Sequence, residues 1–158
     1  MDGHDRDLLL QFAYPLYWVW VIAGWCDFLC HRVTCLPTTS GLAESRLHLL
    51  QLGLMGAAII LLLSLELTAG LALVLLVLVV AHAVTGYLDT RVAFTAGRTT
   101  LPVEQHLHSV LDIAPWLGWG VVIWRVAALP STDWALTPRD NALPWPTWAM
   151  VLAPALVL

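Results

Sequence analysis

Long apolar stretches, separated by short polar segments, make up most of the chain. A helix needs about 20 mostly apolar residues to cross the hydrocarbon core of a bilayer. Four stretches approach that length, at roughly 8–30, 47–65, 71–88 and 107–129, and a shorter fifth covers 143–158. The pattern predicts an all-α fold: an integral membrane four-helix bundle with a short fifth C-terminal segment, forming one transmembrane domain over residues 1–158.

The composition supports this prediction. Of the 158 residues, 59% are hydrophobic and only 11% are charged, whereas an ordinary soluble domain carries about 25% charged residues. The formal net charge is −4 and every basic residue is an arginine. These values argue against a soluble globular protein, a disordered chain and a nucleic-acid-binding protein.

The arginines mark one side of the predicted membrane. Cytoplasmic loops of membrane proteins carry an excess of basic residues. The connections after the first and third predicted helices contain Arg32, Arg46, Arg91 and Arg98, whereas the N-terminal segment is acidic. We therefore expect a protein of the bacterial inner membrane, with its N-terminus outside and these two connections in the cytoplasm.

Histidines and carboxylates recur together near the same ends of the predicted helices. Residues four apart share one face of a helix, about 6 Å apart along its axis. Three pairs have that spacing and a fourth is seven apart: Asp27 and His31, Glu44 and His48, Glu104 and His108, and His82 and Asp89. Because successive helices run in opposite directions, all four pairs would meet at the cytoplasmic end. Helical bundles form dinuclear metal sites from ligands that point inward from four helices.

All members of these pairs form the predicted ligand set: Asp27, His31, Glu44, His48, His82, Asp89, Glu104 and His108. Glu44 and Glu104 are expected to bridge two ions and to serve as the catalytic residues. Asp112 and His106 are expected to support the ligands from outside this set, since His106 faces away from Glu104 on the helix.

An arginine–carboxylate network at the membrane interface is the main alternative to a metal site. Glu44 and Glu104 lie in first helical turns, where the helix dipole favours a carboxylate without any metal. Arginines could also neutralise Asp27 and Asp89, but they leave the paired histidines unexplained. Ionisable residues within membrane segments are usually functional, and we therefore favour a metal site.

Mixed carboxylate and imidazole ligands suit iron, manganese or zinc. The pattern resembles the ferritin-like di-iron carboxylate bundles, in which helices contribute Glu and Glu-x-x-His. Here the spacing is one residue longer, Glu44-x-x-x-His48 and Glu104-x-x-x-His108, and two helices contribute Asp. The resemblance implies two divalent metal ions, with iron preferred and zinc or manganese as alternatives. Copper is a minor option.

Three functions remain open at this point. The first is a di-iron oxidoreductase or hydroxylase that acts on a membrane lipid or a quinone-like, lipid-soluble molecule. The second is a zinc-dependent membrane hydrolase of a lipid, which would use metal-bound hydroxide. The third is a non-catalytic metal transporter or sensor. Expected partners are the lipid, an electron donor at the arginine-bearing loops and a second copy of the chain; nucleic acid is not expected.

Overall fold

The computed structural model describes residues 3–34, 38–140 and 143–156, and the side chains of 14–34, 38–140 and 143–154. The described chain is all-helical. Its five helices are α1 (Gly3–Val33), α2 (Gly41–Ser64), α3 (Ala69–Thr95), α4 (Pro102–Ala127) and α5 (Trp145–Leu156). The prediction of an all-α chain with a short C-terminal helix is confirmed.

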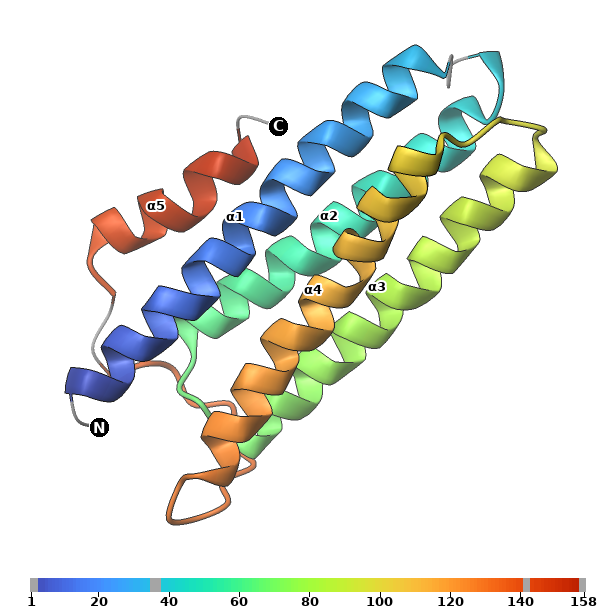
Figure 1. Ribbon diagram of the computed structural model, residues 1–158. Coiled ribbons are helices and arrows are strands. Elements are labelled where there is room, and N and C mark those ends of the chain that lie inside the picture. The colour runs from blue at the N-terminus through green and yellow to red at the C-terminus, as the bar shows by residue number, and fades with distance from the viewer. Residues whose placement is uncertain (1–2, 35–37, 141–142, 157–158) are drawn as a thin grey trace.

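The first four helices run side by side, and α5 lies along the outer side of α1 (Figure 1). Within the group, α2 packs on α3, α3 packs on α4, and α4 packs on α1. The α1–α2 and α3–α4 connections meet at one end, and the α2–α3 connection lies at the other (Figure 1). This topology brings the predicted ligand pairs to one end of the molecule.

Three of these helices, α2, α3 and α4, are long and apolar enough to cross a membrane. Their most apolar 18-residue windows have mean hydropathies of 2.0, 2.4 and 1.3. The prediction of a membrane protein is therefore supported, with three helices as candidate membrane spans. A span through α1 stays a prediction.

The helices extend further toward the ligand end than their apolar stretches indicate. α2 begins at Gly41 rather than near 47, α3 continues to Thr95 rather than ending near 88, and α4 begins at Pro102 rather than near 107. Hydropathy marks the part of a helix suited to lipid, and polar residues can continue the same helix beyond it. As a result, Asp89 lies well inside α3 instead of at its end.

The end of α3 turns the chain sharply back toward the helices. Gly97 has φ +67°, a left-handed conformation that glycine adopts without steric cost. Its N–H donates to the carbonyl of Phe94, and the N–H of Arg98 donates to the carbonyl of Ala93 at 3.0 Å. This pair of hydrogen bonds is a Schellman motif. It places Arg98 next to the ends of α1 and α2, where its side chain lies buried.

The opposite end is closed by the segment between α4 and α5. Arg139 donates hydrogen bonds to the carbonyls of Leu62, Leu63 and Leu65 at 3.0–3.3 Å. These are carbonyls that the end of α2 leaves without helical partners. Thr68 accepts from the N–H of Leu71 at the start of α3.

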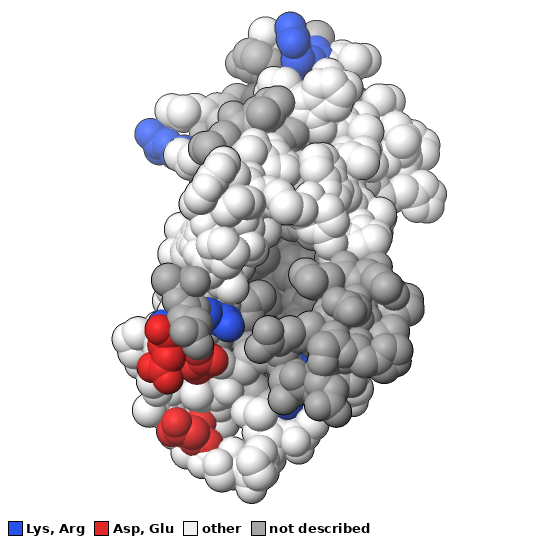
Figure 2. Space-filling model, turned by 90° about the vertical axis from the view of Figure 1, so that its left-hand side faces the viewer, with Lys and Arg blue, Asp and Glu red and all other residues white. Residues whose placement is uncertain are grey.

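Apolar side chains cover much of the outside, while several charged groups are buried. Val77, Phe94 and Trp124 are more than 60% exposed. Buried charged or titratable residues are Asp27, His31, Glu44, His82, Asp89, Arg98 and Glu104. Figure 2 shows charged side chains toward both ends of one face, and the described side chains between them are mostly uncharged. This distribution suits a lipid environment, where interior ionisable groups are costly and usually functional.

Candidate metal centre

The buried ionisable groups gather where α1, α2, α3 and α4 approach the two connections. Glu44 and Glu104 are fully buried, and Asp89 is 2% exposed. They come from α2, α4 and α3, and Asp27 and His31 of α1 lie beside them. The α-helical spacing predicted from the sequence therefore brings carboxylates from four helices into one region.

His31 occupies the middle of this region. Its Nδ1 lies 2.7 Å from the backbone carbonyl oxygen of Asp27. A carbonyl can only accept a hydrogen bond, so Nδ1 is the donor and Nε2 is the ring nitrogen available to a metal in the neutral imidazole. Nε2 lies 2.9 Å from Oε1 of Glu44 and 3.6 Å from Oε1 of Glu104. Fixing one ring nitrogen in this way orients the other, as is usual for metal-binding histidines.

Three imidazole rings converge from three helices. The ring centroids of His31 and His48 are 4.6 Å apart, and His108 lies 6.2 Å from His31 and 6.5 Å from His48. The Nε2 atoms of His31 and His48 face each other at 3.2 Å. With Nδ1 of His31 donating to a carbonyl, Nε2 of His48 donates to the lone pair of His31 Nε2, and a cation bound by both rings would replace this hydrogen bond.

Several close oxygen and nitrogen atoms in the described region lack hydrogen-bond geometry. His108 Nε2 is 3.0 Å from Oδ1 of Asp27, yet neither atom has a hydrogen-bond partner among the described residues. Oδ1 of Asp89 is likewise unpartnered, although His48 Nε2 lies 3.5 Å away. Buried polar atoms left without partners call for an unseen water or ion.

Two overlapping groups of residues have donor atoms close enough to hold a metal ion. In each group, one ligand atom per residue lies within 4.8 Å of all the others. The first group is Asp27, His31, Glu104 and His108, and the second is His31, Glu44 and His48. His31 belongs to both. A single imidazole Nε2 has one lone pair, so His31 can serve only one ion through that atom.

Arg98 lies between the two glutamates that the sequence predicts to bridge metal ions. Its Nη2 is 2.6 Å from Oε1 of Glu44 and also 2.6 Å from Oε1 of Glu104. Nε donates to Oε2 of Glu44 at 3.1 Å, and Nη1 donates to Thr34 at 3.0 Å. Ser40 donates a further hydrogen bond to Glu44. The guanidinium thus supplies the positive charge at the position assigned to a bridging cation.

The surrounding carboxylates keep Arg98 charged. Burial by itself lowers the pKa of this guanidinium, but the hydrogen bond to Glu104 and the charges of Glu44 and Glu104 outweigh it and raise the pKa above its usual value. From the sequence, Arg98 was expected in a cytoplasmic loop, with an arginine–carboxylate network as the alternative to a metal site. At Glu44 and Glu104 such a network is present, and it is formed by Arg98. The glycine immediately before it was the available signal, since Gly commonly ends a helix and reverses the chain.

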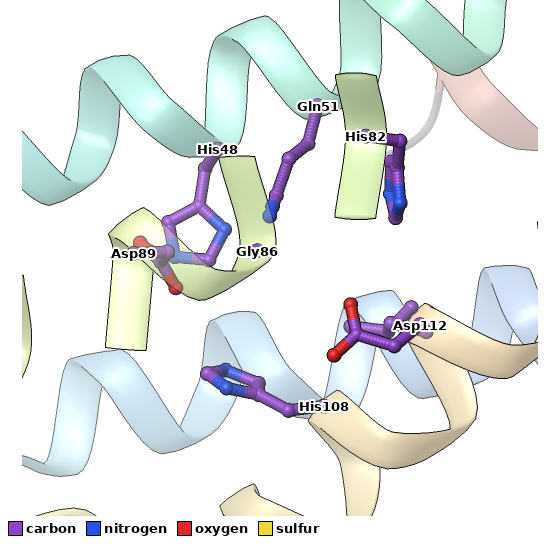
Figure 3. Close-up of a pocket in the computed structure, with 8 residues that line it drawn as sticks. His48, Gln51, His82, Gly86, Asp89, His108 and Asp112 are labelled. Carbon is purple, nitrogen blue, oxygen red and sulfur yellow. The ribbon is translucent and has the colours of Figure 1, made fainter. Parts of the chain in front are cut away.

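A small polar cavity lies on the interior side of the imidazoles, with a volume of about 20 Å³. Figure 3 shows His48 and Gln51 reaching it from α2, Asp89 from α3, and His108 and Asp112 from α4. His82 also lines the cavity, is 4% exposed, and has an unpartnered Nδ1.

The remaining predicted residues therefore separate by position. His82 lies away from the two groups of close donor atoms and borders the cavity instead. Asp112 also borders the cavity and is exposed on α4; its supporting role stays a prediction. His106 is exposed on α4. The orientation predicted for His106, away from Glu104, agrees with this exposure.

Comparison of the chain with protein-family models, curated proteins and solved structures finds no match.

Proposed function

We propose that the chain is a membrane-embedded metalloprotein whose centre is held by His31, His48 and His108 together with nearby carboxylates. The observation that carries the proposal is the convergence of three imidazoles on buried carboxylate oxygens that lack hydrogen-bond partners. Histidine and carboxylate donors suit divalent iron, manganese or zinc better than softer metals. The proposed ligands are completed by Asp27, Glu44, Asp89 and Glu104.

The arrangement of Arg98 bears on the number of ions. Four carboxylates in this region would attract two divalent cations, but Arg98 already neutralises part of the charge between Glu44 and Glu104. With Arg98 in place, one ion can bind to Asp27, His31 and His108, whose donor atoms belong to one close group, while His48 belongs to the other group. Binding a second ion between the two glutamates would require the guanidinium to move. We therefore propose one resident ion, with a two-ion, di-iron form when Arg98 is displaced.

For the reaction, we propose an oxidoreductase that acts on a lipid or a lipid-soluble molecule. Iron in this donor set would supply redox chemistry, and the apolar exterior would bring a hydrophobic substrate to the protein. In this proposal, α1–α4 form a four-helix bundle in a bacterial inner membrane, with the centre near its cytoplasmic face. The chain's own residues would bind the ion, hold Arg98 beside it and keep bulk water away.

The experiment compares metal content in two histidine variants of detergent-purified protein. His108→Ala removes an imidazole 3.0 Å from Asp27, whereas His106→Ala removes an exposed imidazole on the same helix. We expect stoichiometric metal in the wild type and His106→Ala, and at least about tenfold weaker binding in His108→Ala, the loss typical of a metal-site change.

The same samples identify the metal and test the reaction class. Protein from iron-replete, aerobic cultures should contain iron and absorb visible light. Stoichiometric zinc without iron would contradict the oxidoreductase and favour the hydrolase. Equal metal content in both variants, or none in the wild type, would contradict the centre itself.

A further inference from the structure

The small cavity beside the imidazoles is lined both by proposed metal ligands and by residues outside that ligand set. His48, Asp89 and His108 line it. His48 and His108 each belong to one of the two groups of close donor atoms, and Oδ1 of Asp89 lies 3.5 Å from Nε2 of His48. Its other polar walls are His82, Gln51 and Asp112. The cavity therefore has one side at the proposed metal centre and another side formed by residues outside the proposed ligand set.

Its size limits what it can hold. A cavity needs about 10–15 Å³ of this kind of volume to accept one water molecule, and this one has about 20 Å³. It is too small for an alkyl chain. Its polar walls also distinguish it from the dry apolar voids of protein cores.

One wall contains a group that calls for a ligand. His82 is 4% exposed, and its Nδ1 has no hydrogen-bond partner among the described residues. Leaving a buried polar nitrogen unpaired destabilises the folded protein. A molecule in the cavity would remove that destabilisation by donating to, or accepting from, this nitrogen.

A glycine one turn from His82 on α3 also borders the cavity. A Cβ added to Gly86 would lie 2.7 Å from Oδ1 of Asp112 and 3.3 Å from Nε2 of Gln51. Both of these side chains line the cavity. The absent side chain at position 86 thus leaves room for the carboxylate, the amide and the space between them.

We propose that this cavity binds one small ligand of the metal, a water molecule or a diatomic molecule such as dioxygen, at the interior side of the metal centre. Its polar contacts would be His82, Gln51 and Asp112. The inference rests on the proposed metal centre and deepens it by assigning the open ligand position. It also implies that a lipid substrate approaches from another side, since the cavity excludes carbon chains.

The test uses ferrous iron and nitric oxide as probes, without oxygen. Iron content and the paramagnetic resonance signal of the iron–nitrosyl are measured separately for the wild type, Gly86→Ala and Gly56→Ala. Gly56 is the matched control, because a Cβ there meets nothing within 4 Å. We expect all three proteins to bind iron, and Gly86→Ala to bind nitric oxide at least about tenfold more weakly, as overpacking by a methyl group predicts.

A second variant tests the cavity at His82. His82→Ala enlarges the space and should admit methyl isocyanide, which the wild type should exclude, as followed by the visible spectrum of the ferrous protein. Unchanged nitric oxide binding in iron-loaded Gly86→Ala, or isocyanide binding by the wild type, would overturn the assignment of this cavity. Absence of iron from every protein would instead overturn the proposed metal centre.

Discussion

Replacing Arg98 with methionine tests the charge balance of the site. The variant keeps a side chain of comparable length but removes the guanidinium that contacts Glu44 and Glu104 at 2.6 Å each. Both glutamates are fully buried, and Arg98 is 5% exposed. Removing one partner of such a buried ion pair destabilises a protein by about 3–5 kcal/mol, because the remaining charges are buried without compensation.

We therefore expect metal-free Arg98→Met to lose about 3–5 kcal/mol of unfolding free energy. The measurement is denaturant-induced unfolding in detergent micelles, followed by circular dichroism. Arg91→Met is the control, because Arg91 is exposed on α3 near the same end, and exposed substitutions usually change stability by less than about 0.5 kcal/mol.

Added metal provides the sharper half of the test. A divalent ion beside Glu44 and Glu104 would replace the lost positive charge, and a ligand that binds only the folded state stabilises it. Ferrous or manganous ion should therefore stabilise Arg98→Met more than the wild type. If the metal-free variant matched the wild type, or if metal left the difference between them unchanged, the proposed competition between Arg98 and a second ion at Glu44 and Glu104 would be refuted.

Three further predictions concern the end of the molecule opposite the site, and each is measured by thermal unfolding in detergent. Gly70→Ala should destabilise the protein by roughly 1–3 kcal/mol, because its Cβ would lie 2.2 Å from the backbone oxygen of Trp134. Gly53→Ala is the control, since a Cβ there meets nothing within 4 Å. Equal melting temperatures of the two variants would contradict this packing. Thr68→Ala should cost about 1 kcal/mol because the hydroxyl accepts from Leu71 at the start of α3; no loss would mean that this cap contributes nothing. Trp119→Phe should lower the unfolding free energy by about 1 kcal/mol, because it removes a 2.9 Å hydrogen bond to a backbone carbonyl of α3. Its metal content should be unchanged, and an altered metal content would contradict the separation of the two ends.

Much of the candidate site followed from the spacing of its residues. Pairs such as Asp27 and His31 share a helical face, and antiparallel helices bring such faces to one end. Burial of Glu44 and Glu104 was consistent with that expectation. Helix periodicity can make these predictions because it determines side-chain direction from local sequence alone.

Other features depend on contacts that periodicity does not describe. The position of Arg98 results from a left-handed glycine and a long side chain that reaches across to α2. His82 shares a face with Asp89, yet it lies two turns deeper and borders the cavity instead of the close donor groups. The helix ends were misjudged because hydropathy marks lipid-compatible segments rather than where a helix stops.

The most direct test of the metal centre is the X-ray absorption spectrum of the metal in the purified protein. Converging rings of His31, His48 and His108 predict nitrogen and oxygen neighbours only, with clear scattering from imidazole carbons that weakens in His31→Ala. A metal with sulfur neighbours, or one without imidazole scattering, would contradict the centre described by these residues.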